Sequence, residues 1–396
     1  MNPLKNLIRN INIEKYNNFF ILQFFLVFPL LLIPNIFFFI KEYIFEMVKI
    51  IEYILFLIFV SLNYNKTLLR KYLSVILLIL LNIIITFFYR SSGDFLNMSV
   101  RIIPFISLFI SLEISKKGAN KIIQKISFYN LSILLLFLIL GLVIREDISR
   151  NLYNLSHIIG INRDVFFLVS DNLHNTAYLV LIFLFPFLYQ RNLLAYSAVF
   201  IAFILVIGYG VRTVQVAFLL MLSYYLINHI KEIKIRRNIT YILLLILSLF
   251  LLYCFIEIDF SVINKFSSGR IAVWNERLNI LSHYNLKELF FGKGYGSDLF
   301  LSEQWIWGGK LKGSHNDFLT FIFHGGLFSL ALLLLILWQI SKVDKLIVLL
   351  IIVTSILSNA FLFRPIHFMY LMFMWQFLSS NFSASYNNSL KAKDIN

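Results

Sequence analysis

The sequence has few charged residues and a single cysteine. Charged side chains make up 14% of the 396 residues and apolar ones 60%, whereas soluble domains carry about 25% charged residues. A soluble core cannot bury so much apolar surface, so we expect most of it to face lipid. Cys254 lies in an apolar run and excludes both an internal disulfide and a cysteine-based metal site. Since no ligand spacing such as His-Glu-x-x-His occurs, the sequence predicts no metal and no other cofactor.

The charges that are present are mostly basic. There are 35 Lys and Arg residues against 20 Asp and Glu, a formal net charge of +15. In a soluble protein this excess would suggest nucleic acid, but no basic face with exposed aromatic side chains occurs outside the apolar segments. We therefore expect no nucleic-acid partner. Retention of Lys and Arg on the cytoplasmic side of a membrane explains the excess.

About twelve apolar segments predict an all-α, polytopic integral membrane protein, with residues 1–396 forming a single transmembrane domain. The first segment is longer than the apolar core of a signal peptide and lacks a small-residue cleavage site, so we expect it to remain as a span. The predicted spans are 16–40, 43–62, 72–89, 97–114, 127–144, 173–190, 193–209, 213–229, 238–256, 318–340, 346–363 and 366–379.

The distribution of Lys and Arg predicts the orientation. With the N-terminus inside, more than half of the 35 fall in cytoplasmic segments, and long loops weigh little in this rule. An even number of spans returns the C-terminus to the same side. We expect both termini in the cytoplasm and the large loop, 258–317, on the outer face of the membrane between spans nine and ten.

The large loop is the longest segment without membrane character, and we expect it to carry part of an active site. A candidate amphipathic helix places Ile271, Trp274, Leu278 and Leu281 on one side. The glycine-rich segment 292–296 is predicted to be a plain turn rather than a phosphate loop, because no buried strand precedes it.

Three basic side chains are candidates for chemistry. Arg212 lies between two closely linked spans on the outer side, where the positive-inside rule does not favour it; snorkelling to lipid phosphates is the alternative. Arg270 follows Gly269 at the start of the loop helix, where a helix N-terminus and a guanidinium both favour anions, unless it is a solvated charge. His315 precedes an apolar span and could accept a proton near neutral pH, although a histidine there is more often structural.

Together these side chains suit transfer from a glycosyl diphosphate. Two arginines can bind the diphosphate and a histidine can take a proton from an acceptor hydroxyl. Outer carboxylates could replace His315 as the base: Glu276, Asp298, Glu303 and Asp317. Further candidates for contacting the substrate are Ser314, Asn316, Arg364, Arg163 and His174. For Arg364, a helix stop with a snorkelling side chain is the favoured alternative. The segment His324-Gly325-Gly326 is predicted to permit close helix packing.

Four short motifs occur in a fixed order: Gly-Val-Arg at 210–212, Ser-Gly-Arg at 268–270 with Trp274, Gly-x-Gly at 292–294, and Ser-His-Asn at 314–316 followed by an apolar run and two glycines. This order resembles the bacterial O-antigen ligase and repeat-unit polymerase family, most strongly over 205–330. Gly-Val-Arg departs from the commoner Ser-Arg of the family.

The resemblance implies an inner-membrane glycosyltransferase that is independent of metal and inverts the anomeric centre. Its donor would be an undecaprenyl-diphosphate-linked oligosaccharide. By position, Arg212 and Arg270 match the family's diphosphate-binding arginines. His315 matches the histidine proposed to activate the acceptor hydroxyl.

Three functions follow from these features. The first hypothesis is polymerisation of lipid-linked repeat units into a surface polysaccharide, either O-antigen or capsule, with a chain-length regulator and a flippase as further partners. The alternative is an O-antigen ligase that transfers the lipid-linked glycan to lipid A-core in lipopolysaccharide biosynthesis. A flippase for lipid-linked oligosaccharides is the third. It is disfavoured because the polar candidates gather at one face rather than at the middle of the membrane.

Overall fold

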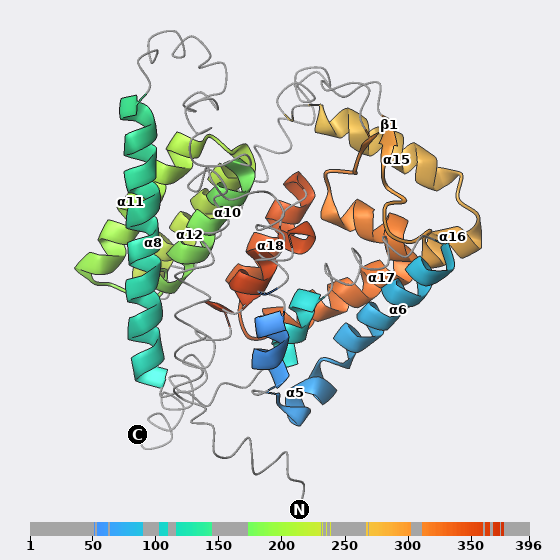
Figure 1. The fold of residues 1–396 in the computed structure, drawn as a ribbon, viewed down its shortest axis with the longest axis horizontal. Helices are drawn as coiled ribbons and strands as arrows, with labels where there is room; N and C mark the ends of the chain where they lie inside the picture. Colours follow the sequence, from blue (N-terminus) through green and yellow to red (C-terminus); the bar gives the residue numbers. More distant parts are fainter. Residues whose placement is uncertain are drawn as a thin grey trace, which may run out of the picture. The chain divides into compact units, whose positions relative to one another are not determined.

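The computed structural model describes residues 51, 54–61, 64–89, 103–109, 116–144, 173–230, 232, 235, 238, 267, 269–301, 311–358, 361–364, 367–372 and 374–375. The chain divides into two compact units. The first comprises Met1–Lys71, Ile106–Leu219 and Met369–Asn396, and the second Tyr72–Phe105 and Leu220–Phe368. The regular elements among the described residues are helices, apart from one pair of two-residue strands (Figure 1), which confirms the all-α prediction in its coarse form.

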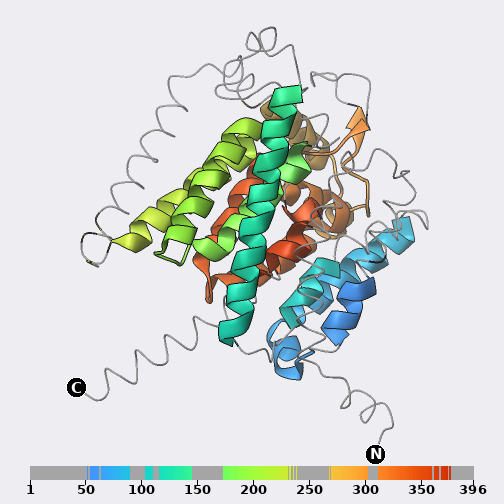
Figure 2. The same cartoon turned by 60° about the vertical axis from the view of Figure 1, so that its left-hand side comes forward.

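The described part of the first unit contains the helices named next, of which η3 begins in the second unit and α12 continues into it. They are α5 (Lys66–Lys71), η3 (Ile103–Phe109), α8 (Lys116–Ile144), α10 (Leu173–Leu184), η6 (Phe185–Phe187), α11 (Leu193–Tyr209) and α12 (Arg212–His229). Helices α8, α10 and α11 pack against one another (Figure 2). Gly208 permits part of this packing, because a Cβ there would lie 2.9 Å from Cδ2 of Leu138.

The second unit is built around one long helix, α17 (Asp317–Ser341). Around it lie α6 (Leu73–Tyr89), α15 (Arg270–Ser282), α16 (Leu286–Phe291) and α18 (Lys345–Leu357), which all contact α17 (Figure 1). The strands β1 (Phe300–Leu301) and β2 (Leu311–Lys312) pair antiparallel in the large loop, and η7 (Phe361–Phe363) follows α18.

Helix α6 runs antiparallel to α17. Near the start of α6, Ser74 Oγ donates to Gln339 Oε1 at 3.0 Å, close to the end of α17. Further along α6, Asn82 Nδ2 donates to Ser329 Oγ at 2.8 Å. Because both side chains are polar in an apolar surrounding, these bonds fix the register of the two helices.

Helix α17 is interrupted at Gly326, where the backbone has φ 68° and ψ −171°. Such a break frees carbonyl groups of the preceding turn, which must find other donors. The loop supplies them: Lys293 N–H donates to Phe323 O at 2.8 Å and Gly294 N–H to His324 O at 2.9 Å. The glycine-rich segment therefore uses these amide groups to dock on α17, in agreement with the predicted turn.

Apolar side chains line one exposed side of α6 and of the second half of α17. On α6 they are Leu73, Leu77, Leu80, Ile84, Phe87 and Phe88. On α17 they are Phe328, Leu334, Leu335 and Trp338, all beyond the break at Gly326. This spacing keeps them on one helix face each. Exposed apolar stripes of this kind are what helices facing lipid present.

Among the described residues, one helix, α17, is both long and apolar enough to cross a membrane. The shorter apolar helices are Leu73–Tyr89, Ile122–Leu136, Thr176–Phe187, Leu193–Tyr209, Arg212–Ile227 and Lys345–Leu357. These helices and the exposed stripes agree with the predicted membrane protein. The number of spans and the outer position of the loop stay predictions.

Several predicted spans match helices and others differ at one end. Helix α11 has the predicted bounds, since Asn192 caps its start through Ala195 N–H and Gly210, with φ 62°, ends it. Helix α8 begins at Lys116 rather than at residue 127. The prediction counted only the apolar run, whereas the helix also includes the basic segment before it. Helix α18 ends at Leu357 rather than at residue 363, because Ser358 is extended. The predicted spans at 16–40 and, apart from Asn238, at 238–256 lie outside the described residues.

Replacing Gly326 by alanine is expected to destabilise the second unit. A Cβ there would lie 2.1 Å from the carbonyl oxygen of Phe290, and φ is +68°. Gly296→Ala is the matched control, since its φ is +77° but the nearest atom, Leu299 Cδ1, lies 3.6 Å away. A positive φ strains an alanine at both positions, by about 1–3 kcal/mol. Thermal unfolding in detergent should show the larger loss for Gly326→Ala; equal losses would contradict the close contact.

Spin labels on the exposed stripes are expected to contact lipid. In a Cys254→Ser background, labels at Leu80→Cys and Leu335→Cys should collide with oxygen and be protected from a water-soluble nickel complex, because both side chains are exposed apolar positions. Power-saturation measurements in nanodiscs check this. Ser282→Cys, at an exposed polar position at the end of α15, is the control for water contact. Nickel accessibility at Leu335 equal to that at Ser282 would contradict the assignment.

Candidate functional site

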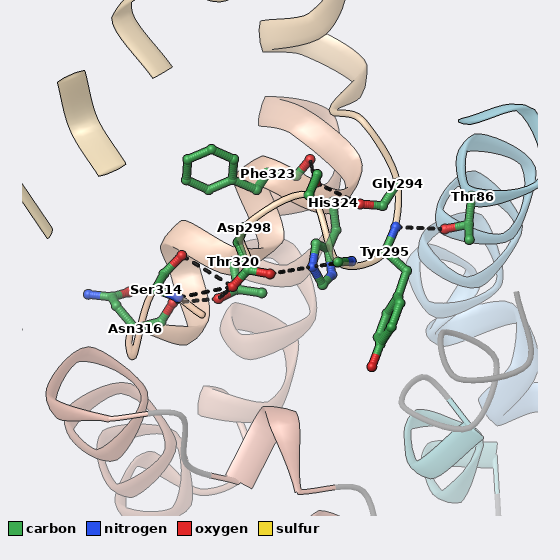
Figure 3. Close-up of polar contacts among 11 residues, drawn as sticks. Thr86, Gly294, Tyr295, Asp298, Ser314, Asn316, Thr320, Phe323 and His324 are labelled. Carbon is green, nitrogen blue, oxygen red and sulfur yellow. Dashed lines mark hydrogen bonds and ion pairs between the residues drawn. The ribbon is translucent and has the colours of Figure 1, made fainter. Parts of the chain in front are cut away.

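The large loop closes around a buried carboxylate, Asp298. Its Oδ2 accepts hydrogen bonds from the backbone N–H of Ser314 at 3.0 Å, from Ser314 Oγ at 3.3 Å and from Thr320 Oγ1 at 2.9 Å. Its Oδ1 lies 3.0 Å from Nε2 of His324 (Figure 3). Asp298 therefore connects the end of the loop to the first two turns of α17.

The environment keeps the Asp298 carboxyl ionised. Burial raises its pKa, but the hydrogen bond and charge of His324, with the bonds from Ser314 and Thr320, outweigh burial and lower the pKa below its ordinary value. Because an ionised carboxylate only accepts hydrogen bonds, we assign a proton of His324 to Nε2. The backbone nitrogen of Gly296 also lies 3.1 Å from Nε2, which places the glycine turn beside the cluster.

His315 lies in a left-handed turn between two buried residues. Its φ is 50°, the only positive φ of a non-glycine residue among those described. For an L-residue this conformation costs about 1–2 kcal/mol, so the surroundings must hold it. Ser314 and Asn316 on either side are buried, whereas His315 is half-buried. Asn316 caps α17 by accepting from Leu319 N–H at 3.1 Å.

Arg270 and Asn316 meet at the C-terminal end of α18. The guanidinium Nη1 of Arg270 donates to the carbonyl oxygen of Leu357. The amide Nδ2 of Asn316 donates to the preceding carbonyl oxygen, that of Ile356, at 3.3 Å. A helix C-terminus attracts cations and donors through its last carbonyl groups. The end of α18 thus brings Arg270 together with the turn that carries His315.

The start of α15 is closed by Ser267 rather than open to an anion. Arg270 N–H donates to Ser267 O at 3.4 Å, and Ile271 N–H to Ser267 Oγ at 3.4 Å. Two of the amide groups that the sequence offered to an anion are therefore used within the protein. The Arg270 guanidinium remains the anion-binding candidate at this position.

Arg277 is a buried charge that the sequence pattern did not predict. The predicted apolar face of α15 contained Leu278, but Leu278 is exposed, and the buried side chains are Ala272, Val273, Arg277 and Leu281. The Arg277 guanidinium lies 4.8 Å from the centre of the Phe300 ring and 3.6 Å from the Glu276 carboxylate. Burial lowers its pKa, while Glu276 and Asp298 raise it.

The remaining predicted residues lie in other elements or outside the described residues. Arg212 begins α12 in the first unit, so its convergence with Arg270 and His315 stays a prediction. Arg364 follows η7 in the second unit, and its N–H donates to Phe361 O at 3.1 Å. Arg163 lies outside the described residues, and for His174 the structure describes only the backbone, in α10.

The alternative carboxylate bases are constrained by burial. Asp298 is 4% exposed and engaged by three residues, and Asp317 is fully buried at the start of α17. Glu276 is paired with Arg277. Glu303 lies outside the described residues. Among the described candidates, His315 therefore has the better access to an acceptor hydroxyl than either aspartate.

Asp298→Asn is expected to lower stability at neutral pH, by about 3 kcal/mol, because His324 would lose its charged partner. Since the folded pKa is depressed below 3.8, this contribution is present above pH 4 and is lost as the pH falls further. The difference in thermal unfolding midpoint between wild type and Asp298→Asn should therefore become smaller from pH 6 to pH 2.

Glu288→Gln is the control. Glu288 forms an ion pair with Lys293 at the surface, where such pairs contribute little to stability. Glutamine also preserves the cap of α16. Its unfolding midpoint should stay close to that of wild type. A constant gap for Asp298→Asn at every pH would contradict an ionised carboxylate.

Comparison with known proteins gives one relevant similarity. No protein-family model matches the chain. Over 305 residues it is 24% identical to the ComP-specific O-oligosaccharyltransferase of Acinetobacter baylyi, an alignment that covers 72% of this chain and 55% of that protein. The chain thus spans about half the length of this relative. The relative is named for oligosaccharide transfer, which supports the ligase side of the predicted resemblance rather than the polymerase side.

Proposed function

We propose that this chain is a membrane glycosyltransferase of the O-antigen ligase type, which transfers an oligosaccharide from a polyprenyl diphosphate to an acceptor hydroxyl. The observation that carries the proposal is the meeting of Arg270 and the His315 turn at the end of α18. A cation and a proton acceptor held at one place are what this transfer requires. The similarity to an oligosaccharyltransferase supports the same reaction class.

In the proposed reaction the arginine acts on the leaving group and the histidine acts on the acceptor. Arg270 binds the diphosphate and stabilises the negative charge that grows as the bond from its oxygen to the sugar breaks. Arg212 is a second candidate for the diphosphate on the grounds of its sequence motif. His315 takes the proton of the acceptor hydroxyl while that oxygen forms the new bond to the anomeric carbon. Attack opposite to the leaving diphosphate inverts the configuration. The lipid diphosphate departs as an anion.

Ligase-type transfer takes precedence over repeat-unit polymerisation. The sequence placed polymerisation first, but the similar protein is an oligosaccharyltransferase, and this favours transfer to a separate acceptor. We place the reaction on the outer face of the bacterial inner membrane, where the large loop is expected. A chain-length regulator would be needed only for polymerisation.

Transfer assays separate these functions. Purified full-length protein in nanodiscs is incubated with an undecaprenyl-diphosphate-linked oligosaccharide and, in separate arms, with lipid A-core, with a second lipid-linked unit or with a candidate protein acceptor. Ligase-type transfer predicts one glycan added to a non-polymer acceptor. A ladder of lipid-linked products would instead support the polymerase, and movement of the lipid-linked unit across a bilayer without a new bond would support the flippase.

Arg270→Ala is expected to lower kcat/KM by about 100-fold or more, the usual cost of removing one donor from a developing charge. Arg270→Lys should recover only part of this, because an ammonium cannot reproduce the planar two-pronged contact of a guanidinium. Lys287→Ala, at an exposed cation of α16, is the matched control and should keep wild-type activity. Unfolding midpoints are measured alongside, since Arg270 also contacts α18. Unchanged donor affinity in Arg270→Ala would contradict the diphosphate assignment.

His315→Ala is expected to lower kcat by about 100-fold or more with little change in donor affinity, because a general base acts in the chemical step. Steady-state rates and donor binding are measured on the same preparation. His283→Ala removes an exposed histidine at the end of α15 and is the matched control. A His315→Ala variant with a wild-type turnover rate would contradict its role as base.

A further inference from the structure

We propose that Asp298 is a positioning residue for His315: through Ser314 and Thr320 it holds the turn that presents this histidine to the acceptor. The inference rests on the proposed function, in which His315 takes the acceptor proton. Asp298 lies 17 residues before His315 in a different part of the loop. Its contacts with Ser314 and Thr320 therefore depend on the fold and not on local sequence.

The turn needs an external support. His315 adopts a left-handed backbone that a histidine does not favour, with φ 50°. Surrounding structure must therefore hold it, as is usual where such conformations occur at functional sites.

Asp298 supplies this support on both sides of the histidine. On the loop side, its Oδ2 accepts from the backbone N–H of Ser314 at 3.0 Å. On the helix side, the same oxygen accepts from Thr320 Oγ1 at 2.9 Å, and this hydroxyl shares its one hydrogen with Asn316 O at 3.1 Å. One oxygen atom thus joins the residue before His315 to the first turn of α17 (Figure 3).

The carboxylate is itself held in a fixed orientation. Its second oxygen lies 3.0 Å from Nε2 of His324, two residues before the break of α17 at Gly326. The neighbouring Ser297 Oγ donates to Phe323 O at 2.7 Å, one residue before His324. Both contacts tie residues 297 and 298 to a rigid helix, so a displaced carboxylate would have to break several bonds at once.

Asp298 and His324 are too deeply buried to act on the substrate themselves. Asp298 is 4% exposed and His324 is 1% exposed, so neither side chain reaches a substrate hydroxyl. His315, between buried neighbours, is the half-buried member of the group. Asp298 and His324 therefore act through the backbone of the turn, and His315 is the residue that meets the acceptor.

Kinetics of single and double variants test the proposal in full-length protein in nanodiscs. Asp298→Asn keeps the side-chain shape but removes the charge, and it should lower kcat about 10-fold or more with donor KM unchanged. In a His315→Ala background the same substitution should change the rate by less than about 3-fold, because the histidine it positions is gone. An equal loss in both backgrounds would overturn the proposal and leave Asp298 a purely structural residue.

A second readout does not need transfer activity. Diethyl pyrocarbonate modifies accessible neutral histidines, and peptide mass spectrometry measures the rate at His315 against the exposed His283 of the same molecule. Asp298→Asn should change the His315 to His283 rate ratio several-fold, since the turn is released. An unchanged ratio would overturn the positioning role. If Asp298→Asn changes the ratio but the wild-type protein shows no transfer, the proposed function is contradicted instead.

A milder variant protects the test from loss of folding. Thr320→Val keeps the shape of the side chain and removes one hydrogen bond to Asp298 Oδ2. It should shift both readouts in the same direction as Asp298→Asn, by a smaller factor. Thr354→Val is the control, because Thr354 Oγ1 donates within α18 to Leu350 O at 2.8 Å and does not touch the cluster. Equal effects of Thr320→Val and Thr354→Val would overturn the proposal.

Discussion

The break of α17 at Gly326 is the constraint on which the second unit depends. A continuous helix would use the carbonyl groups of Phe323 and His324 internally, whereas the break leaves them to the amide groups of Lys293 and Gly294. Backbone groups in an apolar surrounding must be satisfied, so this exchange fixes the loop on the helix. Gly292 and Gly326 make the approach possible, because a Cβ at either position would overlap backbone atoms across the contact.

Docking of the loop in turn determines where its charges lie. Asp298 reaches His324 and Ser314 only because residues 293–297 are attached to α17. Removing a carboxylate and a guanidinium from water is costly unless each finds partners. Asp298 has several charge-assisted bonds, and Arg277 combines the Glu276 carboxylate with the Phe300 ring. The buried charges thus favour one arrangement of the loop over looser alternatives.

The sequence predicted what depends on local pattern. The bounds of α11 follow from an apolar run between a capping asparagine and a glycine, and α17 from an apolar run after Asn316. Arg270 and His315 were predicted as candidates from their motifs, and their roles stay predictions. The partnership of Asp298 and His324 was not predictable, because it joins residues 26 positions apart through a helix break. The burial of Arg277 was missed because an amphipathic pattern assigns charged side chains to water.

The same break relates the chemistry to the membrane. Exposed apolar side chains on α17 begin at Phe328, just beyond Gly326, while the half before the break is covered by the loop and α16. From Asp317 to Gly326 the helix rises about 14 Å at 1.5 Å per residue. From Gly326 to Ser341 the helix rises only about 22 Å, less than the roughly 30 Å hydrocarbon core, so a stripe that meets the hydrocarbon leaves the His315 turn near the interfacial layer. A lipid diphosphate anchored in that layer carries its sugar outward, towards the height at which the end of α18 holds Arg270 and the His315 turn.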